Sequence, residues 1–235
     1  MISATSLVNA DTVEYIKTLP DNCIDLIATD PPYYRVKACS WDNQWKTEAD
    51  YLAWLDALLA EFWRVLKPNG SMYIFCGSRL ASDTELLVRQ RFDVLSHIIW
   101  AKPSGPWKRQ NKESLRKYFP ATERIIFAGH YPGPYQSKDK HLRRHFSVTV
   151  DVPYTDVWTY PPVQYYPGKH PCEKPAAMMA HIISASSRPG EVVADFFMGS
   201  GSTIKEAIRL GRIGLGVELE KERFDQTFGE IYPEE

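Results

Sequence analysis

The sequence of 235 residues has few cysteines and no long apolar run. Its four cysteines, Cys23, Cys39, Cys76 and Cys172, form no CxxC pair, which argues against a disulfide framework and a zinc site and favours a reduced, cytoplasmic compartment. No stretch reaches the roughly 18 apolar residues of a membrane helix. Residues 1–11 lack the basic and apolar regions of a secretory leader. We therefore expect a cytoplasmic protein with no metal and no membrane partner.

The charge is nearly balanced but unevenly distributed. The formal net charge is −1, yet residues 101–150 hold eleven basic and three acidic side chains, a net charge of +8, which leaves −9 for the remainder. Such a division within one chain indicates a local surface for a polyanion.

Apolar segments of strand length alternate with helical periodicity on both sides of a middle part that has little periodicity. This alternation predicts an α/β fold with a mostly parallel sheet and right-handed crossovers. We expect the helix over residues 51–66 to end at Lys67-Pro68-Asn69-Gly70, before a separate strand. The predicted strands are residues 24–29, 71–76, 98–100, 124–128, 191–195 and 213–218. Two further helices are predicted, one over residues 176–187 and one that the turn at residues 196–203 opens and that ends at residue 210.

A glycine-rich segment joins a predicted strand to a predicted helix near the end of the chain. It reads Phe196-Phe197-Met198-Gly199-Ser200-Gly201-Ser202-Thr203, and Glu218 ends the next strand. Glycines let backbone amides approach a ligand at a helix N-terminus. A carboxylate at the end of the next strand can accept hydrogen bonds from two ribose hydroxyl groups. The absence of GKS or GKT excludes a phosphate loop. The segment predicts a site for a nucleoside-bearing ligand; the alternative is an ordinary tight turn.

A rigid acidic turn, Asp30-Pro31-Pro32-Tyr33, directly follows the predicted strand over residues 24–29. The two prolines fix the backbone and leave carbonyl groups that no proline amide can pair. A carboxylate, a free carbonyl and an aromatic ring on one turn suit an exocyclic aromatic amine. The alternative is a simple turn that ends a strand. The turn is predicted to be functional because it accompanies the glycine-rich segment on the same sheet.

In this order, the motifs resemble those of the amino-methylating DNA methyltransferases of the permuted β group. That family implies a Rossmann-like, mostly parallel sheet of the S-adenosylmethionine-dependent methyltransferase type, circularly permuted. Residues 1–100 and 168–235 would form the catalytic and cofactor-binding α/β domain, and residues 101–167 a short inserted basic target-recognition region. The matching segments are residues 19–33, 41–45, 64–70, 170–175 and 195–203.

The resemblance implies S-adenosylmethionine as the cofactor and assigns residues to it. Glu218 would hold the ribose, Asp11 would lie near the adenine, and Lys174 would approach the methionine carboxylate. For Asp11 the alternative is a helix N-cap. Asp30 and Asp195 belong to the same cofactor set. The residues implied for the methionine part are Phe196, Gly199, Gly201, Ser202 and Thr203.

The implied reaction is methyl transfer to the exocyclic amino group of a base that is flipped out of double-stranded DNA. Asp30, Pro31, Pro32 and Tyr33 would form the catalytic turn, with Asp30 and the Pro31 carbonyl accepting from the amine and Tyr33 stacking on the base. Within the family, aspartate at the first motif position favours adenine over cytosine. The alternatives are an N4-cytosine methyltransferase on the same fold and a DNA-binding relative without catalysis.

The basic middle region would contact DNA phosphates, and the family allows a homodimer. Aromatic side chains between these charges, among them Tyr118 and Phe119, are expected to pack in the core or in loops; the alternative is a part in nucleic-acid contact. The expected phosphate contacts are Lys108, Arg109, Lys112, Arg116, Lys117, Arg143 and Arg144.

Overall fold

The computed structural model describes residues 2–35, 44–105, 111–130, 143–149, 152–164, 166 and 172–233. The strands in this part of the chain are β1 (Ser6–Asn9), β2 (Ile24–Thr29), β3 (Leu66–Cys76), β4 (Phe92–Ala101), β5 (Thr122–His130), β6 (Val157–Trp158), β7 (Val192–Asp195) and β8 (Ile213–Glu218). The α-helices are α1 (Thr12–Ile16), α2 (Glu48–Val65), α3 (Ala81–Arg89), α4 (Ala176–Ser186), α5 (Ser202–Arg209) and α6 (Lys221–Ile231), and η3 (Lys112–Ser114) is a 3-10 turn.

The strands form one eight-stranded sheet in the order β1-β8-β7-β2-β3-β5-β4-β6. Five of the seven neighbouring pairs are parallel, and both antiparallel pairs involve β5. Among the described strands, therefore, only β5 runs against the others. The expected mostly parallel α/β sheet is confirmed.

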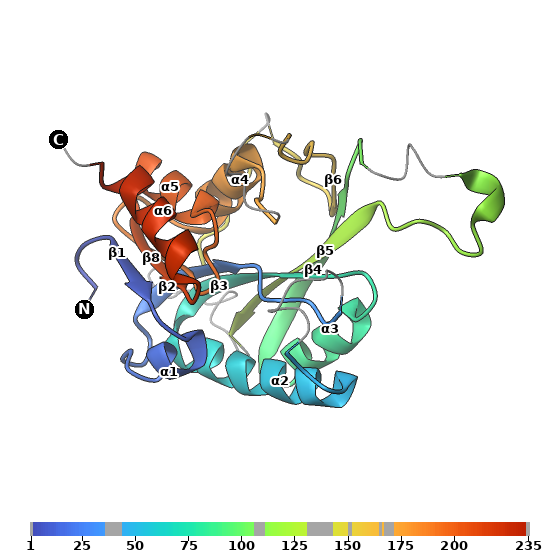
Figure 1. Cartoon of the computed structure of the whole chain (residues 1–235). Helices are drawn as coiled ribbons and strands as arrows, with labels where there is room; N and C mark the ends of the chain where they lie inside the picture. Colours follow the sequence, from blue (N-terminus) through green and yellow to red (C-terminus); the bar gives the residue numbers. More distant parts are fainter. Residues whose placement is uncertain are drawn as a thin grey trace.

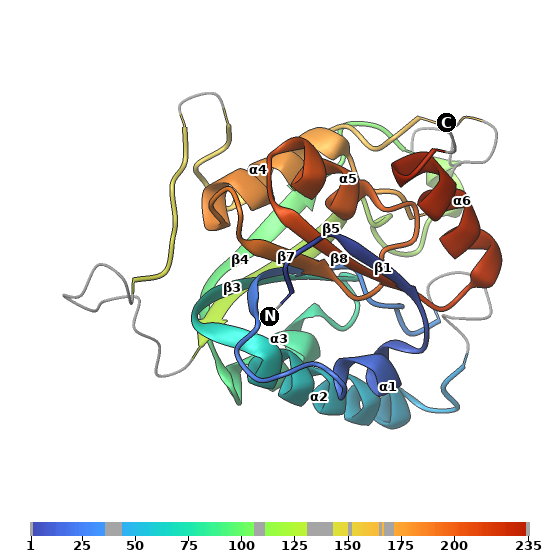
Figure 2. The ribbon, with the colours of Figure 1, turned by 90° about the vertical axis from the view of Figure 1, so that its left-hand side faces the viewer.

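Helices cover both faces of the sheet. In Figure 1, α1, α2 and α3 lie below it and α4, α5 and α6 above it, and Figure 2 shows the same two layers from the side. Each face has its own apolar core: Leu55 and Phe62 of α2 are buried on one side, and Met178 and Ile182 of α4 on the other. No helix of the described residues is long and apolar enough to cross a membrane.

The strands at residues 24–29 and 213–218 begin and end where the sequence predicts. Helix α2 begins earlier than expected, because Thr47 and Asp50 form a reciprocal capping box. The predicted interruption at residues 67–70 is wrong in part: β3 already begins at Leu66. Its register against β2 shifts between Ile24 and Leu26, so the chain bulges through the Pro-Gly segment and returns to the same strand.

The basic middle region contributes to the sheet itself. Strand β5 pairs with both β3 and β4, and β6 pairs with β4. Both strands lie within residues 101–167, so a boundary at residue 101 passes through the sheet rather than around a separate insert. The remaining described residues of this region, 102–105, 111–121, 143–149, 152–156, 159–164 and 166, lie outside its strands.

Candidate active site

A cavity of about 520 Å³ lies at the carboxyl ends of β2, β7 and β8, within the range of about 300–1,000 Å³ that is usual for ligand sites. Tyr33 of the acidic turn and Gly199 of the glycine-rich turn both line it. Ligands of open α/β sheets bind at this edge because parallel strands end there together and the connecting loops diverge. The two turns share one cleft, as the sequence predicts.

Asp195 joins the two turns. One of its carboxylate oxygens accepts from the Thr29 hydroxyl at 2.8 Å, and the other accepts from the Thr203 hydroxyl at 2.7 Å. The backbone amide of Phe197 donates to the same carboxylate at 3.1 Å. Burial raises the pKa of Asp195 to about 6, although these hydrogen bonds oppose the shift. Asp195 therefore holds the ends of β2, β7 and α5 in fixed relation.

Glu218 holds the glycine-rich turn from the next strand. One carboxylate oxygen accepts from the backbone amide of Gly199 at 2.9 Å, and the other accepts from the amide of Glu220 at 2.8 Å. Glu218 lines the cavity, and each carboxylate oxygen has the capacity to accept a second hydrogen bond. Burial raises the pKa of this carboxyl group, and the backbone amides counteract the rise.

The turn has a positive φ at both of its glycines, and at Gly199 the angle is +49°. Gly201, the N-cap of α5, has φ +70°, a left-handed conformation that favours glycine. A Cβ atom there would lie 2.5 Å from the Thr227 methyl group. Gly201 does not line the cavity, whereas Gly199, Ser202 and Thr203 do.

The expectation that Phe196 lines the cofactor site is not what the structure gives. Phe196 is fully buried, and its ring stacks on Phe62 of α2 at a centroid distance of 5.2 Å. Phe197 lines the cavity instead, edge-on to Trp54 at 5.9 Å. Both residues lie in the turn after β7, where strand alternation does not set the direction of a side chain. Two consecutive phenylalanines therefore left the choice open, and the sequence reasoning also passed over Trp54.

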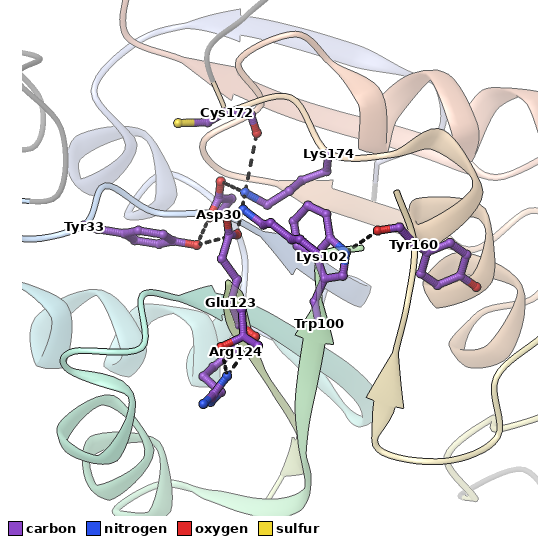
Figure 3. Close-up of polar contacts among 10 residues, drawn as sticks. Asp30, Tyr33, Trp100, Lys102, Glu123, Arg124, Tyr160, Cys172 and Lys174 are labelled. Atoms are coloured by element: carbon purple, nitrogen blue, oxygen red, sulfur yellow. Dashed lines mark hydrogen bonds and ion pairs between the residues drawn. The ribbon is translucent and has the colours of Figure 1, made fainter. Parts of the chain in front are cut away.

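The acidic turn ends in a buried group of charged side chains (Figure 3). The Tyr33 hydroxyl donates to one oxygen of Asp30 at 2.5 Å, and the Lys174 ammonium donates to the other. The same ammonium lies 3.4 Å from Glu123 of β5, which also pairs with Lys102. All five side chains line the cavity. Sequence reasoning missed Glu123 and Lys102 because no motif marks them.

The pKa values of these groups shift together. Burial raises the pKa of Asp30, with the Lys174 charge opposing the rise and Glu123 adding to it. Burial disfavours the charge on Glu123 too, but Lys174 and Lys102 outweigh it and lower the pKa of that carboxyl. Burial likewise opposes the charge on Lys174, and the two carboxylates outweigh it, so that its pKa is raised.

Asp11 is the helix N-cap that the sequence offers as an alternative, and its place near the adenine stays a prediction. Its side chain accepts from the Glu14 amide at 3.1 Å as the N-cap of α1, and it also lines the cavity. The Lys174 side chain, by contrast, is directed at Asp30 and Glu123 on the side of the cleft formed by the acidic turn, and its contact with the methionine carboxylate stays a prediction. His170 and residues 41–43 lie outside the described residues.

The predicted DNA contacts fall on two separate surfaces. Lys112, Arg116 and Lys117 lie in the exposed segment 111–120, which leaves the sheet beside the cavity, where the Lys102 amide donates to the Ala121 carbonyl at 3.0 Å. Tyr118 in this segment is 100% exposed, so its expected packing role is wrong.

Arg143 and Arg144 lie at the opposite end of the sheet. Their segment is held there by the Ser147 amide, which donates to Ala185 near the end of α4 at 2.9 Å. The Arg144 guanidinium lies 4.8 Å from the Phe127 ring centroid and 5.5 Å from that of Phe146, packed on rings rather than directed at solvent. Lys108 and Arg109 lie outside the described residues.

The sequence matches known proteins along most of its length. Residues 24–229 match the family described as DNA methylase. The chain is 31% identical over 239 residues to the DNA adenine methyltransferase YhdJ of Escherichia coli (strain K12), a match that covers 93% of this chain and 80% of that protein.

The fold is also similar to those of solved methyltransferase structures. The crystal structure of the M1.HpyAVI-SAM complex aligns with a TM-score of 0.70 at 27% identity, over 97% of this chain and 99% of that one. The cytosine-N4-specific PvuII DNA methyltransferase aligns with a TM-score of 0.76 at 18% identity, over 95% of this chain and 86% of that one. Because the identity is low, this match supports the fold alone. Fold and cleft define an S-adenosylmethionine-dependent methyltransferase. The sequence match is more specific: the chain belongs to the DNA methylase family.

Proposed function

We propose that this protein transfers a methyl group from S-adenosylmethionine to the N6 amino group of adenine in DNA. The observation that carries the proposal is the single cleft in which the Asp30-to-Tyr33 turn faces the glycine-rich turn. Membership of the DNA methylase family supports DNA as the substrate. The adenine relative YhdJ supports the choice of base, as does the aspartate that begins the acidic turn.

The residues at the glycine-rich side of the cleft fit the cofactor. Glu218 offers carboxylate lone pairs to the ribose hydroxyls while its two hydrogen bonds to backbone amides fix its orientation. Phe197 and Trp54 form an aromatic wall for the adenine ring, and Asp11 lies in the same lining. S-adenosylmethionine supplies an electrophilic methyl group when bound.

The residues of the acidic turn fit the acceptor base. The amine lone pair of adenine is delocalised into the ring, which makes the nitrogen a poor nucleophile. Hydrogen bonds from the amine to Asp30 and to the Pro31 carbonyl would localise that lone pair, and Tyr33 would stack on the base. Pro31 and Pro32 hold the turn rigid, so that little orientation entropy is lost on binding. As the new C–N bond forms, the bond between the methyl carbon and the sulfonium sulfur breaks, and the nitrogen gives up one proton to the Asp30 carboxylate or to water.

DNA would approach along segment 111–120. A base in the duplex reaches the cleft only if it is flipped out, at a cost of a few kcal/mol. Replacing Lys112, Arg116 and Lys117 by glutamine should weaken DNA binding uniformly across sequences. The logarithm of the binding constant falls linearly with the logarithm of the salt concentration, and this salt slope should become less steep by about 0.9 for each phosphate that is no longer neutralised. Arg209→Gln, at the exposed end of α5 and outside the cavity lining, serves as the control and should leave the slope unchanged.

The proposal is tested by incubating the purified protein with labelled S-adenosylmethionine and unmethylated genomic DNA, followed by nuclease digestion. N6-methyladenine is expected in the digest, and Asp30→Ala should abolish transfer while DNA affinity is retained. N4-methylcytosine would favour the cytosine alternative. DNA binding without cofactor binding in calorimetry would favour a relative that has lost catalysis. The homodimer stays a prediction, which sedimentation of the same preparation would check.

A further inference from the structure

Four charged side chains meet at the base-facing side of the cleft, from four separate parts of the chain (Figure 3). Asp30 follows β2, Lys102 follows β4, Glu123 lies on β5 and Lys174 precedes α4. Their formal charges sum to zero. The side chains of Asp30, Glu123 and Lys174 are only 17%, 18% and 8% exposed, so a change in one pairing must be balanced within the group.

Both oxygens of Asp30 are engaged by side chains of this protein. Tyr33 donates to Oδ1 at 2.5 Å, and Lys174 donates to Oδ2. Under the proposed function, the amine of the target base must donate to this same carboxylate. An ammonium is a stronger donor to a carboxylate than a neutral amine is. Lys174 therefore competes with the substrate for Asp30.

One oxygen of Glu123 lies next to both donors that occupy Asp30. Glu123 Oε2 is 3.4 Å from the Lys174 ammonium nitrogen and 3.5 Å from the Tyr33 hydroxyl oxygen. The other oxygen of Glu123 is paired with Lys102, which anchors the carboxylate. A small movement of Lys174 would exchange one carboxylate for the other without leaving the ammonium unpaired.

We propose that Glu123 is a positioning residue that receives Lys174 when the target amine binds Asp30. The proposal rests on the proposed methyl transfer and adds the event that frees its acceptor. Glu123 does not touch the base: it acts through Lys174. Without Glu123, Lys174 would stay on Asp30, and the amine would be excluded from it.

The test is a double-mutant comparison of Glu123→Gln and Lys174→Met, with single-turnover methylation measured at saturating S-adenosylmethionine. Glu123→Gln should slow methyl transfer by about tenfold or more and change cofactor affinity by less than about threefold. Lys174→Met should retain at least about half of the wild-type rate, because Asp30 is then open to the amine. In the Lys174→Met background, Glu123→Gln should change the rate by less than about threefold.

Rescue distinguishes positioning from a structural role. If Glu123 only stabilised the fold, the double variant would be slower than either single variant; here it should be faster than Glu123→Gln alone. Glu123→Asp, which keeps the charge, should restore part of the rate. A double variant no faster than Glu123→Gln, or an inactive Lys174→Met, overturns the inference. A wild-type protein that methylates no adenine would instead overturn the proposed function.

Discussion

Glu218→Gln gives a sharp test of the cofactor site because it changes charge and hydrogen-bonding capacity but almost no volume. The carboxylate now accepts from two backbone amides, those of Gly199 and Glu220. A glutamine has one carbonyl oxygen, so its NH2 group must face one of these N–H groups. Leaving a buried N–H unpaired costs about 1–3 kcal/mol of folding free energy, with the lower end expected because Glu218 is only partly buried.

Cofactor affinity should fall as well. A hydrogen bond to a charged group contributes about 1.5–3 kcal/mol, and each 1.4 kcal/mol is about tenfold in the dissociation constant. Removing one hydrogen bond to the ribose should therefore weaken S-adenosylmethionine binding roughly ten- to a hundredfold. Isothermal calorimetry measures the affinity, and thermal unfolding without cofactor measures the change in stability.

The control for this test is Glu222→Gln. It makes the same chemical change in the exposed first turn of α6, outside the cavity lining. It should leave both affinity and stability unchanged. If Glu218→Gln bound the cofactor within about threefold of wild type, Glu218 would not be the ribose ligand.

Two further predictions concern the framework of the cleft. Gly216→Ala places a Cβ atom 2.5 Å from the sulfur of Met198, which lines the cavity, and should lower the free energy of unfolding by about 1–3 kcal/mol. A Cβ atom added at Gly229 of α6 would have no atom within 4 Å, so Gly229→Ala should raise the free energy of unfolding by about 0.5–1 kcal/mol. If urea denaturation showed the same change in stability for both variants, the packing argument would be refuted. Burial raises the folded-state pKa of Asp195 to about 6 from 3.8, so its contribution to stability is full below about pH 4 and lost as pH rises through 6. Wild-type stability relative to Asp195→Asn should fall by about 3 kcal/mol at most between pH 4 and 7, and a flat difference across that range would contradict it.

Local patterns were enough for much of the fold. The apolar run before Asp30 and the run before Glu218 each predict a strand with its true bounds, because burial on both faces requires continuous apolar residues. The breaker segment at residues 67–70 was harder. Proline and glycine there produce a bulge, and only the pairing of β3 with β2 on both sides keeps the strand continuous.

The sequence by itself determined the two turns, their order and the chemistry each can offer, since these depend on residue types within a few positions of one another. Tertiary structure alone decided which phenylalanine lines the cavity, because both lie in the turn after β7 and only packing, of Phe196 on Phe62 and of Phe197 on Trp54, separates them. It alone decided that Arg144 packs on Phe127 and Phe146. It also brought Glu123 and Lys102 to Asp30, because strand pairing between distant segments carries no local signal in the chain.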